Sequence, residues 1–355
     1  MNKPFLRQLI SGVKPPEQPE FHAFLDRVMN NEADKSEVIA FLSGLSAKPL
    51  CLENVENFVS YYFKLTPAKR LEGSEGAVNV VGTGGGSIGT FNISTAAAFV
   101  ASAAGAKVLK SGSAAYSSQC GSLDVLQALG VPMPESEAQM AEMVGEFNLG
   151  FIPPSHYGPL LKKLLIKVLP IAFRDIAGFV NTIGPLLCPY QVSGRLVGVG
   201  QPQYLDVFSA FYAQHQQKNT LLVYADCGMD EFCSIGINHY RLVDAGIQRW
   251  ELSTRKLGFG HGELGELAGG APLENAAILR SILSNQRLGE ARNTVVLNSA
   301  ALLFLANKAA SIEAGIQLAE TAITEGAALN QLNRLVDWGS RLKSKNNVAM
   351  AVNVS

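Results

Sequence analysis

The sequence is poor in charge and in cysteine, and it has no long apolar segment. Charged residues make up 17% of the 355 residues, and 29 Lys and Arg nearly balance 30 Asp and Glu. The resulting net charge of -1 provides no basic field for nucleic acid or for an acidic membrane surface. Hydrophobic residues nevertheless make up 47% of the chain, which excludes a disordered protein and predicts a large buried core.

The cysteines indicate a reducing environment. They are odd in number, scattered and without a Cys-x-x-Cys pair, so they favour neither a disulfide framework nor a zinc site. No apolar run follows the basic start, so no signal peptide is visible. The weakly charged stretch 91–106 is too short and too polar to span a bilayer. We therefore expect a cytoplasmic protein with free thiols and no membrane partner.

Hydrophobic spacing predicts a helical part followed by an alternating part. Residues 1–72 carry apolar stripes at helical spacing, and Asp34 with Glu37 resembles a capping box. After a linker at 71–77 and a β-branched strand at 78–81, we expect helices at 94–105, 123–129, 273–283, 294–307 and 312–326, and strands at 107–110, 196–199, 220–225 and 241–243.

This order of elements predicts the α/β class. We expect a small N-terminal helical subdomain at residues 1–72, joined by a helical segment near 160–185. A large α/β domain with a mainly parallel central sheet is expected at residues 76–343. Residues 344–355 are expected to form a loose tail.

The most informative segment is rich in glycine and lies where the first strand meets a helix. Five of the 34 glycines fall between Gly82 and Gly89. Such a turn lets backbone N–H groups approach an anion, and a helix starting near Ser94 directs its N-terminal dipole at the same place. Neutral donors are added by Thr83, Asn92, Ser94 and Thr95. The segment is neither a Walker loop nor a GxGxxG fingerprint, and a tight turn that only requires glycine is the alternative.

Two further segments favour a ligand that carries phosphate. Lys110 opens a loop of small residues that runs to Ser122, with one cation and many hydroxyls. Asp230 and Glu231 follow an apolar strand. Adjacent acids are poorly placed as a general acid–base pair, but they suit Mg²⁺, which takes one or two carboxylates together with substrate phosphates. A solvated acidic loop is the alternative.

In their order and spacing, these segments resemble the anthranilate phosphoribosyltransferases and their relatives among the pyrimidine nucleoside phosphorylases. Residues 29–42 resemble the family's N-terminal helical signature. The other residues that carry the resemblance are Gly82, Thr83, Gly84, Gly85 and Asn92–Thr95 in the pyrophosphate loop; Lys110, Gly112, Ser117, Ser118, Gly121, Ser122 and Asp124 in the next motif; Asn181, Gly184, Pro185, Leu186 and Pro189; Gly228, Asp230 and Glu231 in the magnesium motif; and Gly269, Gly270, Asn275 and Ala276 in a late helix.

The resemblance implies a homodimer, formed through the helical part, with its site in a cleft between subdomain and domain. It implies transfer of a 5-phosphoribosyl group from phosphoribosyl pyrophosphate to an aromatic amine, with Mg²⁺ as cofactor. Charge then grows on the leaving pyrophosphate, where backbone donors, Lys110 and metal can stabilise it.

The resemblance also implies roles for residues at its motif positions, including some at which this chain departs from the family. Lys110 and Arg174 are the implied catalytic residues, and Ser94, Asp230 and Glu231 the implied metal ligands. Phosphoribosyl pyrophosphate is assigned to Gly82, Thr83, Gly84, Gly85, Asn92, Ser94, Thr95, Lys110, Ser117, Ser118 and Ser122. The acceptor is assigned to Ser111, Ser113, Arg174, Gly184 and Pro185.

Departures from the family pattern gather on the acceptor side. This chain has Gly86 where the family has Asp, and Gln119 where the family has a cation. It has Ile171 and Ala177 where the family has Arg. The family's Lys-His-Gly-Asn-Arg motif is replaced by the residues from Lys110 to Ala114. A carboxylate is best bound by a bidentate Arg, which Ile171 cannot supply. Arg174, three residues further along a predicted helix, can supply one. The alternative is that Arg174 has no role in binding and lies at the surface or in an ion pair.

Three functions therefore stay open. The first is an anthranilate-type phosphoribosyltransferase of tryptophan biosynthesis, or one with a changed acceptor. The second, a nucleoside phosphorylase-like enzyme, is favoured by Arg174-Asp175 and disfavoured by Asp230-Glu231. The third is a catalytically weak homologue that binds nucleotide or nucleic acid. Loss of the loop Asp and the acceptor Arg favours it, whereas the near-zero net charge and the retained acidic pair argue against it.

Overall fold

The computed structural model describes residues 3–12, 14–112 and 120–352. In these residues the chain begins with the helices α1 (Lys3–Ser11), α2 (Gln18–Met29), α3 (Lys35–Ser46) and α4 (Leu52–Leu65). The predicted capping box is present at the start of α3, where the backbone N–H of Asp34 donates to Glu37 Oε2 at 3.0 Å. This end of α3 is thereby fixed before the apolar stripe begins.

The α/β part is built on a sheet of seven strands in the order β3-β2-β1-β4-β5-β6-β7. Its strands are β1 (Val78–Gly82), β2 (Val108–Ser111), β3 (Leu149–Ile152), β4 (Gly194–Gly198), β5 (Thr220–Ala225), β6 (Ile237–Val243) and β7 (Ile247–Ser253). Neighbours from β3 to β5 pair in parallel, and β6 and β7 pair antiparallel at one edge. The predicted α/β class and mainly parallel sheet are confirmed. Strands β3 and β7 are not anticipated by the sequence pattern.

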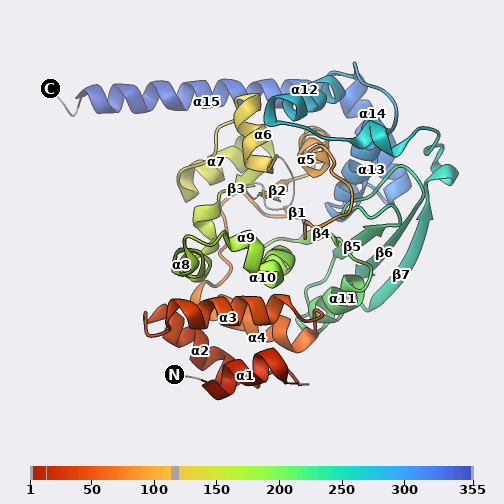
Figure 1. The fold of residues 1–355 in the computed structure, drawn as a ribbon. Helices are drawn as coiled ribbons and strands as arrows, with labels where there is room; N and C mark the ends of the chain where they lie inside the picture. The colour runs from red at the N-terminus through yellow and green to blue at the C-terminus, as the bar shows by residue number, and fades with distance from the viewer. Residues whose placement is uncertain (1–2, 13, 113–119, 353–355) are drawn as a thin grey trace.

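Helices connect and cover these strands. They are α5 (Ile93–Ala103), α6 (Ser122–Leu129), α7 (Glu137–Phe147), α8 (Pro159–Val168), α9 (Phe173–Ile176), α10 (Gly178–Ile183), α11 (Tyr204–Gln214), α12 (Pro272–Leu283), α13 (Glu290–Leu305), α14 (Ile312–Thr324) and α15 (Ala327–Val352). Helix α15 extends away from the body of the protein (Figure 1). The expected loose tail is therefore helical as far as Val352, because residues that follow an existing helix extend it without a new nucleus.

The sheet separates two hydrophobic cores, since successive side chains of a strand point to opposite faces. Leu196 and Leu221 enter the core shared with α5 and α13, whereas Val197 and Leu222 enter the core shared with the N-terminal helices. Helices α8, α10 and α11 also contribute to this second core, which lies between the sheet and α1–α4 (Figure 1). The segment near 160–185 thus packs with the N-terminal helices although it follows β3 in the chain.

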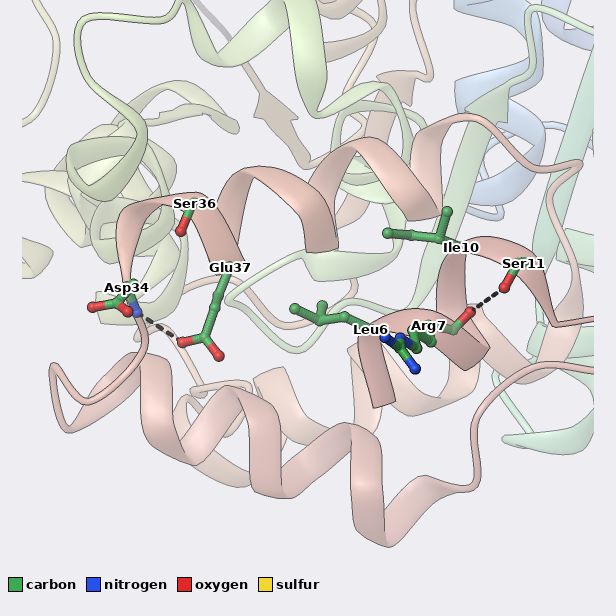
Figure 2. Close-up of a pocket in the computed structure, with 7 residues that line it drawn as sticks. All are labelled: Leu6, Arg7, Ile10, Ser11, Asp34, Ser36 and Glu37. Carbon is green, nitrogen blue, oxygen red and sulfur yellow. Dashed lines mark hydrogen bonds between the residues drawn. The ribbon is translucent and has the colours of Figure 1, made fainter. Parts of the chain in front are cut away.

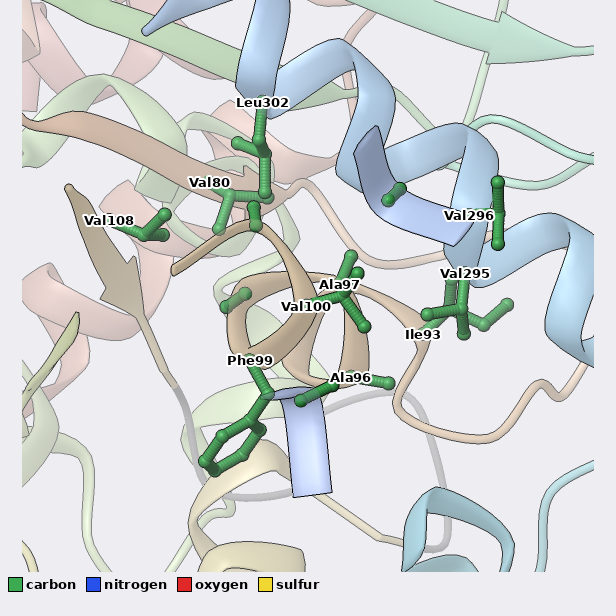
Figure 3. Packing of buried hydrophobic residues seen from close by; sticks show 14 of the residues in the cluster. Val80, Ile93, Ala96, Ala97, Phe99, Val100, Val108, Val295, Val296 and Leu302 are labelled. Atoms are coloured by element: carbon green, nitrogen blue, oxygen red, sulfur yellow. The ribbon is translucent and has the colours of Figure 1, made fainter. Parts of the chain in front are cut away.

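Small residues let α5 pack tightly against α13 and the sheet. Figure 3 shows Val80 of β1, Ala97 and Val100 of α5, and Val296 of α13, which belong to one buried cluster. This packing fixes the N-terminus of α5 relative to the strand ends. In the part of the chain that the structure describes, no helix has the length and apolarity needed to cross a membrane.

Candidate functional site

The site lies where the parallel strands end. Strands β2, β1, β4 and β5 are neighbours in the sheet, so their carboxyl ends share one edge, which is where open α/β sheets bind ligands. Gly82 ends β1, Lys110 lies near the end of β2, and Gly198 ends β4. The turn after β5 carries Asp230 and Glu231 to the same edge, as the contacts below show.

The glycine-rich loop closes around Asp230. Asp230 Oδ2 accepts a hydrogen bond from the backbone N–H of Gly84 at 2.8 Å, and the carbonyl of Gly228 accepts one from Ser87 N at 3.0 Å. Gly84 and Gly85 have φ of 68° and 76°, a left-handed conformation that glycine adopts without strain. The loop therefore presents backbone donors, and in this structure a carboxylate of the protein itself accepts one of them.

Glu231 binds the start of α5 in the same way. Its Oε1 accepts a hydrogen bond from Ser94 N at 3.0 Å, one of the N–H groups that a helix leaves unpaired in its first turn. Its Oε2 is inaccessible to solvent and has no hydrogen-bond partner among the described residues. Ser94, Gly198, Asp230, Glu231 and Asn298 are among the residues that line a cavity of about 10 Å³ here.

Lys110 provides the positive charge of the site. It is buried, and its Nζ donates to the carbonyl of Ser111 at 2.8 Å. Burial lowers the pKa of Lys110 to about 8, although the charges of Glu231 and Asp230 oppose this change. Burial likewise raises the pKa of Glu231 to about 7, together with the negative charge of Asp230. The three groups thus share one poorly solvated space in which each charge depends on the others.

The donor set fits a small hard cation. Among the described residues, no group of three or more His, Cys, Asp and Glu side chains is arranged to hold a metal, so the protein alone offers no closed metal cage. Two carboxylates and the Ser94 hydroxyl suit Mg²⁺, which commonly leaves its other positions to water and phosphate. The unpartnered Oε2 of Glu231 is the observation that favours a cation, because a buried carboxylate oxygen without a partner is costly.

Two glycines that the sequence interpretation did not single out are needed for this geometry. A Cβ on Gly198 would lie 1.5 Å from the carbonyl O of Asp230, and one on Gly200 would lie 2.6 Å from the carbonyl O of Gly84. The Thr83 hydroxyl also accepts a hydrogen bond from Gly200 N at 2.8 Å. In the sequence, the Gly-Val-Gly at the end of an apolar strand, residues 198–200, could have indicated these two glycines.

Position 86, where the family has Asp, lies directly against the acidic turn. A Cβ on Gly86 would lie 2.9 Å from the carbonyl O of Gly228 and 3.4 Å from Asp230 Oδ1. A side chain here would push the loop away from the turn. Gly86 is therefore compatible with the closed loop that the structure shows, whereas a carboxylate at this position would face another carboxylate.

The other predicted phosphate-side residues surround this centre. Asn92 Nδ2 donates to the carbonyl of Cys120 at 3.3 Å, and Asn92 Oδ1 accepts from Asn275 Nδ2 at 3.0 Å, which ties the loop to α6 and α12. Thr95 is buried in α5, and Ser122 begins α6. The predictions for Ser113, Ser117, Ser118 and Gln119 lie outside the described residues.

On the acceptor side, no hydrogen bond or ion pair joins the predicted residues to one another among the residues that the structure describes. Ser111 is buried and its hydroxyl accepts from Asn79 Nδ2 at 3.0 Å. Gly184 and Pro185 form a 3-10 turn after α10. Arg174 lies outside the buried cluster, since its side chain is 61% exposed and pairs with the adjacent Asp175 at 3.5 Å. At Ala177, where the family has a second Arg, the residue is completely buried.

The proximity of Tyr157 to Ser111 was not anticipated from the sequence. Burial raises the pKa of Tyr157 and the Ser111 side chain opposes this change, so the loop that follows β3 lies beside the acceptor-side end of β2. His156, next to it, shares a hydrogen bond of 2.5 Å between its Nδ1 and the hydroxyl of Tyr190. Since Tyr157 occurs in no recognisable motif, its proximity to Ser111 depends on tertiary structure.

Comparisons with known proteins agree with this arrangement. A family profile described as "Glycosyl transferase family, a/b domain" matches residues 74–329. The anthranilate phosphoribosyltransferase of Rubrobacter xylanophilus is 33% identical over 342 residues, which cover 96% of this chain and 98% of the relative. That of Thermomicrobium roseum is 34% identical over 316 residues, which cover 88% of this chain and 89% of the relative.

Solved structures show the same fold. The crystal structure of anthranilate phosphoribosyltransferase from Thermus thermophilus has a TM-score of 0.79 at 27% identity, covering 94% of this chain and 99% of that chain. The Saccharomyces cerevisiae enzyme in complex with PRPP and Mg has a TM-score of 0.79 at 23% identity, covering 96% and 98% of the two chains. At that identity the second likeness concerns the fold alone.

Proposed function

The chain belongs to the anthranilate phosphoribosyltransferase family, and from this premise we propose that it transfers a 5-phosphoribosyl group from phosphoribosyl pyrophosphate to an aromatic amine. The acceptor is anthranilate or a related amine. The observation that carries the proposal is the convergence of Asp230, Glu231 and Lys110 on the glycine-rich loop and the start of α5. This arrangement binds an anion and a cation together, as a sugar pyrophosphate with its metal requires.

Each group of the chain has a distinct task in this reaction. Asp230, Glu231 and Ser94 would hold Mg²⁺, which when bound neutralises charge on the leaving pyrophosphate. Lys110 binds the pyrophosphate as a buried cation, and the N–H groups of Gly84 and Ser94 donate to its oxygens. Because Asp230 and Glu231 accept these hydrogen bonds in this structure, the ligand must replace the carboxylates as their acceptor.

The proposal is tested by incubating the protein with phosphoribosyl pyrophosphate and Mg²⁺, with and without anthranilate, and following release of pyrophosphate. We expect release that depends on the acceptor and on Mg²⁺. Asp230→Asn combined with Glu231→Gln should abolish it, whereas Asp244→Asn, at an exposed acid after β6, should not. Tight binding of the sugar pyrophosphate without release would refute anthranilate as the acceptor.

A second candidate is a catalytically weak homologue that binds nucleotide or nucleic acid. Two observations favour it: Ile171 in place of the family Arg, and the exposed position of Arg174. Binding of a nucleotide without turnover of any aromatic amine would establish this function. Failure to bind the sugar pyrophosphate at all would also exclude the first proposal.

We further propose a homodimer, formed through the helical part, in the cytoplasm. A cavity of about 340 Å³ lies between α1 and α3, and Leu6, Ile10 and Glu37 are among the residues that line it (Figure 2). Apolar side chains are also exposed at Ile10 of α1, at Ile166 of α8 and at Leu169, which directly follows α8. A hydrogen bond from Lys35 Nζ to the carbonyl of Leu169 joins α3 to α8.

Exposed apolar side chains in this helical part support a protein partner. Sedimentation velocity should give a dimer for the full chain, and Ile166→Glu with Leu169→Glu should give a folded monomer. A monomer in the unmodified protein would refute this part of the proposal.

A further inference from the structure

One edge of the central sheet is open. Strand β7 pairs with β6 on one side, and no strand or isolated bridge pairs with its other side among the residues that the structure describes. The strand at the opposite edge, β3, is buried along its whole length, whereas β7 is exposed at residues 248–251. Figure 1 shows β7 at the outside of the molecule. An open edge strand offers its unpaired backbone groups to a second strand.

The hydrogen bonds of the β6–β7 hairpin show which residues of β7 face the open side. Thr254 N donates to the carbonyl of Gly236, directly opposite it, at 3.2 Å. Hydrogen-bonded and non-hydrogen-bonded pairs alternate along an antiparallel ladder. Counting back from Thr254, the N–H and C=O of Trp250 face β6. The N–H and C=O of Arg249 and Glu251 face the open side.

The side chains at this edge are two opposite charges and an aromatic ring. Arg249 and Glu251 share one face of the sheet, because residues two apart in a strand do so, and their side chains are 67% and 70% exposed. Their contacts within the chain are long, at 3.7 Å from Arg249 to Asp206 and 3.5 Å from Glu251 to His239 Nδ1. Trp250 lies between them on the other face and is 53% exposed. All three side chains are therefore accessible to a partner.

A second copy of β7 is complementary to this pattern. When two copies run antiparallel about Trp250, the whole strand Ile247–Ser253 overlaps, because Trp250 is its central residue. Arg249 of each copy then lies opposite Glu251 of the other, and the two residues can exchange backbone hydrogen bonds because both face outward. Trp250 lies opposite its own copy in a non-hydrogen-bonded pair, where cross-strand side chains come closest. Opposite charges and paired aromatic rings at such positions stabilise a sheet.

The charges also select this register among the possible ones. An axis at Arg249 would place two guanidinium groups opposite each other, and an axis at Glu251 would place two carboxylates opposite each other. Like charges directly across a ladder destabilise it. Charged residues on an edge strand generally prevent pairing with other strands. On β7 they disfavour the shifted pairings and favour the one that is centred on Trp250.

We propose that β7 is a self-association surface, at which two copies of this chain join their sheets edge to edge in the register centred on Trp250. The surface differs from the helical one proposed above, since β7 and α8 lie at opposite sides of the molecule in Figure 1. The contact of two seven-residue strands is small, so it joins copies, or dimers formed through the helical part, only at protein concentrations of about 0.1 mM or more. It depends neither on that dimer nor on the proposed reaction.

Sedimentation velocity of the full chain at two concentrations tests the association. We expect the weight-average mass at about 0.3 mM to exceed that at about 1 µM by about 1.5-fold. Arg249→Glu and Glu251→Arg should each abolish this increase, because each places like charges opposite each other. An equimolar mixture of the two variants should restore it, since the two acids of one then face the two arginines of the other.

The matched control is Arg255→Glu, the same charge reversal at an exposed residue just after β7, which should leave the increase unchanged. A mass that does not rise with concentration would overturn the proposal and leave the edge to a different partner. Association that survives both single variants, or that their mixture does not restore, would overturn the pairing. The mixture also excludes misfolding as the cause, because misfolded variants would not regain association.

Cross-linking tests the register. The two copies of Trp250 would have Cα atoms about 4.5 Å apart, so Trp250→Cys should form a disulfide between copies on mild oxidation. Gln248→Cys, exposed on the same face of β7, should not, because residue 248 then lies opposite Leu252. Peptide mapping distinguishes this bond from any formed by the five native cysteines. Absence of the disulfide in Trp250→Cys, or its formation in Gln248→Cys instead, would overturn the centred register.

Discussion

Replacing Glu231 by Gln should make the ligand-free protein more stable while it removes a metal ligand. Burial and the nearby Asp230 raise the pKa of Glu231 from 4.5 to about 7. A raised carboxyl pKa means that the folded state binds this proton more tightly than the unfolded state does. Its stabilising effect is complete below pH 4.5 and is lost as the pH rises through 7. The ionised carboxylate then costs at most ~3 kcal/mol at pH 8 and less than ~1 kcal/mol at pH 5.

The local geometry preserves this gain in the variant. The amide oxygen of Gln can keep the hydrogen bond from Ser94 N, which Glu231 Oε1 accepts at 3.0 Å. Its amino group replaces Oε2, which already has no hydrogen-bond partner among the described residues. The residue as a whole keeps some exposure, although its Oε2 is inaccessible, so we take ~3 kcal/mol as the upper limit.

The matched control is Glu290→Gln, the same change at a buried carboxylate whose pKa is shifted in the opposite direction. Burial alone would raise the pKa of Glu290, but donors from Ser234, Gly262, Asn293 and His261 outweigh it and the pKa is lowered. Its stabilising effect is present above pH 4.5 and is lost as the pH falls through the folded-state pKa. Loss of hydrogen bonds to a charged group should therefore destabilise this variant by ~2 kcal/mol at pH 8.

Urea unfolding at pH 8 and pH 5 without Mg²⁺, followed by circular dichroism, measures both effects. Glu231→Gln should raise the midpoint clearly at pH 8 and little at pH 5, and Glu290→Gln should lower it. If Glu231→Gln is destabilised at pH 8 as the control is, the Glu231 charge is well compensated in the free protein, and the argument for a missing cation is refuted.

Two other predictions test the same site. The pKa of Lys110 is lowered to about 8 by burial, so pyrophosphate binding, measured by calorimetry, should weaken as the pH rises above about 8. In Lys110→Gln, binding should be weaker at every pH. If this variant keeps the pH dependence, the dependence belongs to another group. Gly198→Ala places a Cβ 1.5 Å from the carbonyl O of Asp230 and should lower the free energy of unfolding, measured in urea, by more than ~3 kcal/mol. The control is Gly145→Ala in α7, where nothing lies within 4 Å of the new Cβ; it should be neutral or stabilising by up to ~1 kcal/mol. Equal stability of the two variants would contradict the close packing at β4.

The elements with regular patterns could be predicted from the sequence, and those defined by neighbours could not. The strand before Gly82 and the helix after Asn92 follow from β-branched residues, glycines and a run of Ala, and the structure has β1 and α5 there. Strand β3 has only four residues and is buried on both faces, so it has no alternation to detect. Strand β7 is mostly exposed and gains its partner only in the hairpin with β6.

The site shows the same division. The glycine-rich loop, Lys110 and the acidic pair are recognisable because chemistry restricts their residue types. The sequence does not reveal that Asp230 accepts the loop's own hydrogen bond, because that depends on the spacing of β1 and β5 across β4. Nor does it reveal the Asn298 contacts to Phe232 or the proximity of Tyr157 to Ser111, which bring together residues 66 and 46 positions apart.

The electrostatics of the site argue for a ligand that carries both signs of charge. Burial lowers the pKa of Lys110 and raises the pKa of Glu231. In the free protein, the charged forms of these two groups therefore destabilise the folded state. An anion alone would relieve Lys110 but worsen the repulsion on Asp230 and Glu231, and a cation alone would do the reverse. A phosphate ligand together with a divalent cation relieves both. This requirement concerns binding only and is independent of the acceptor side, where Ile171 and Ala177 replace the family's arginines. The retained binding site and the altered acceptor side are therefore separable, and measurements of sugar-pyrophosphate affinity and of transfer to each amine must be made independently.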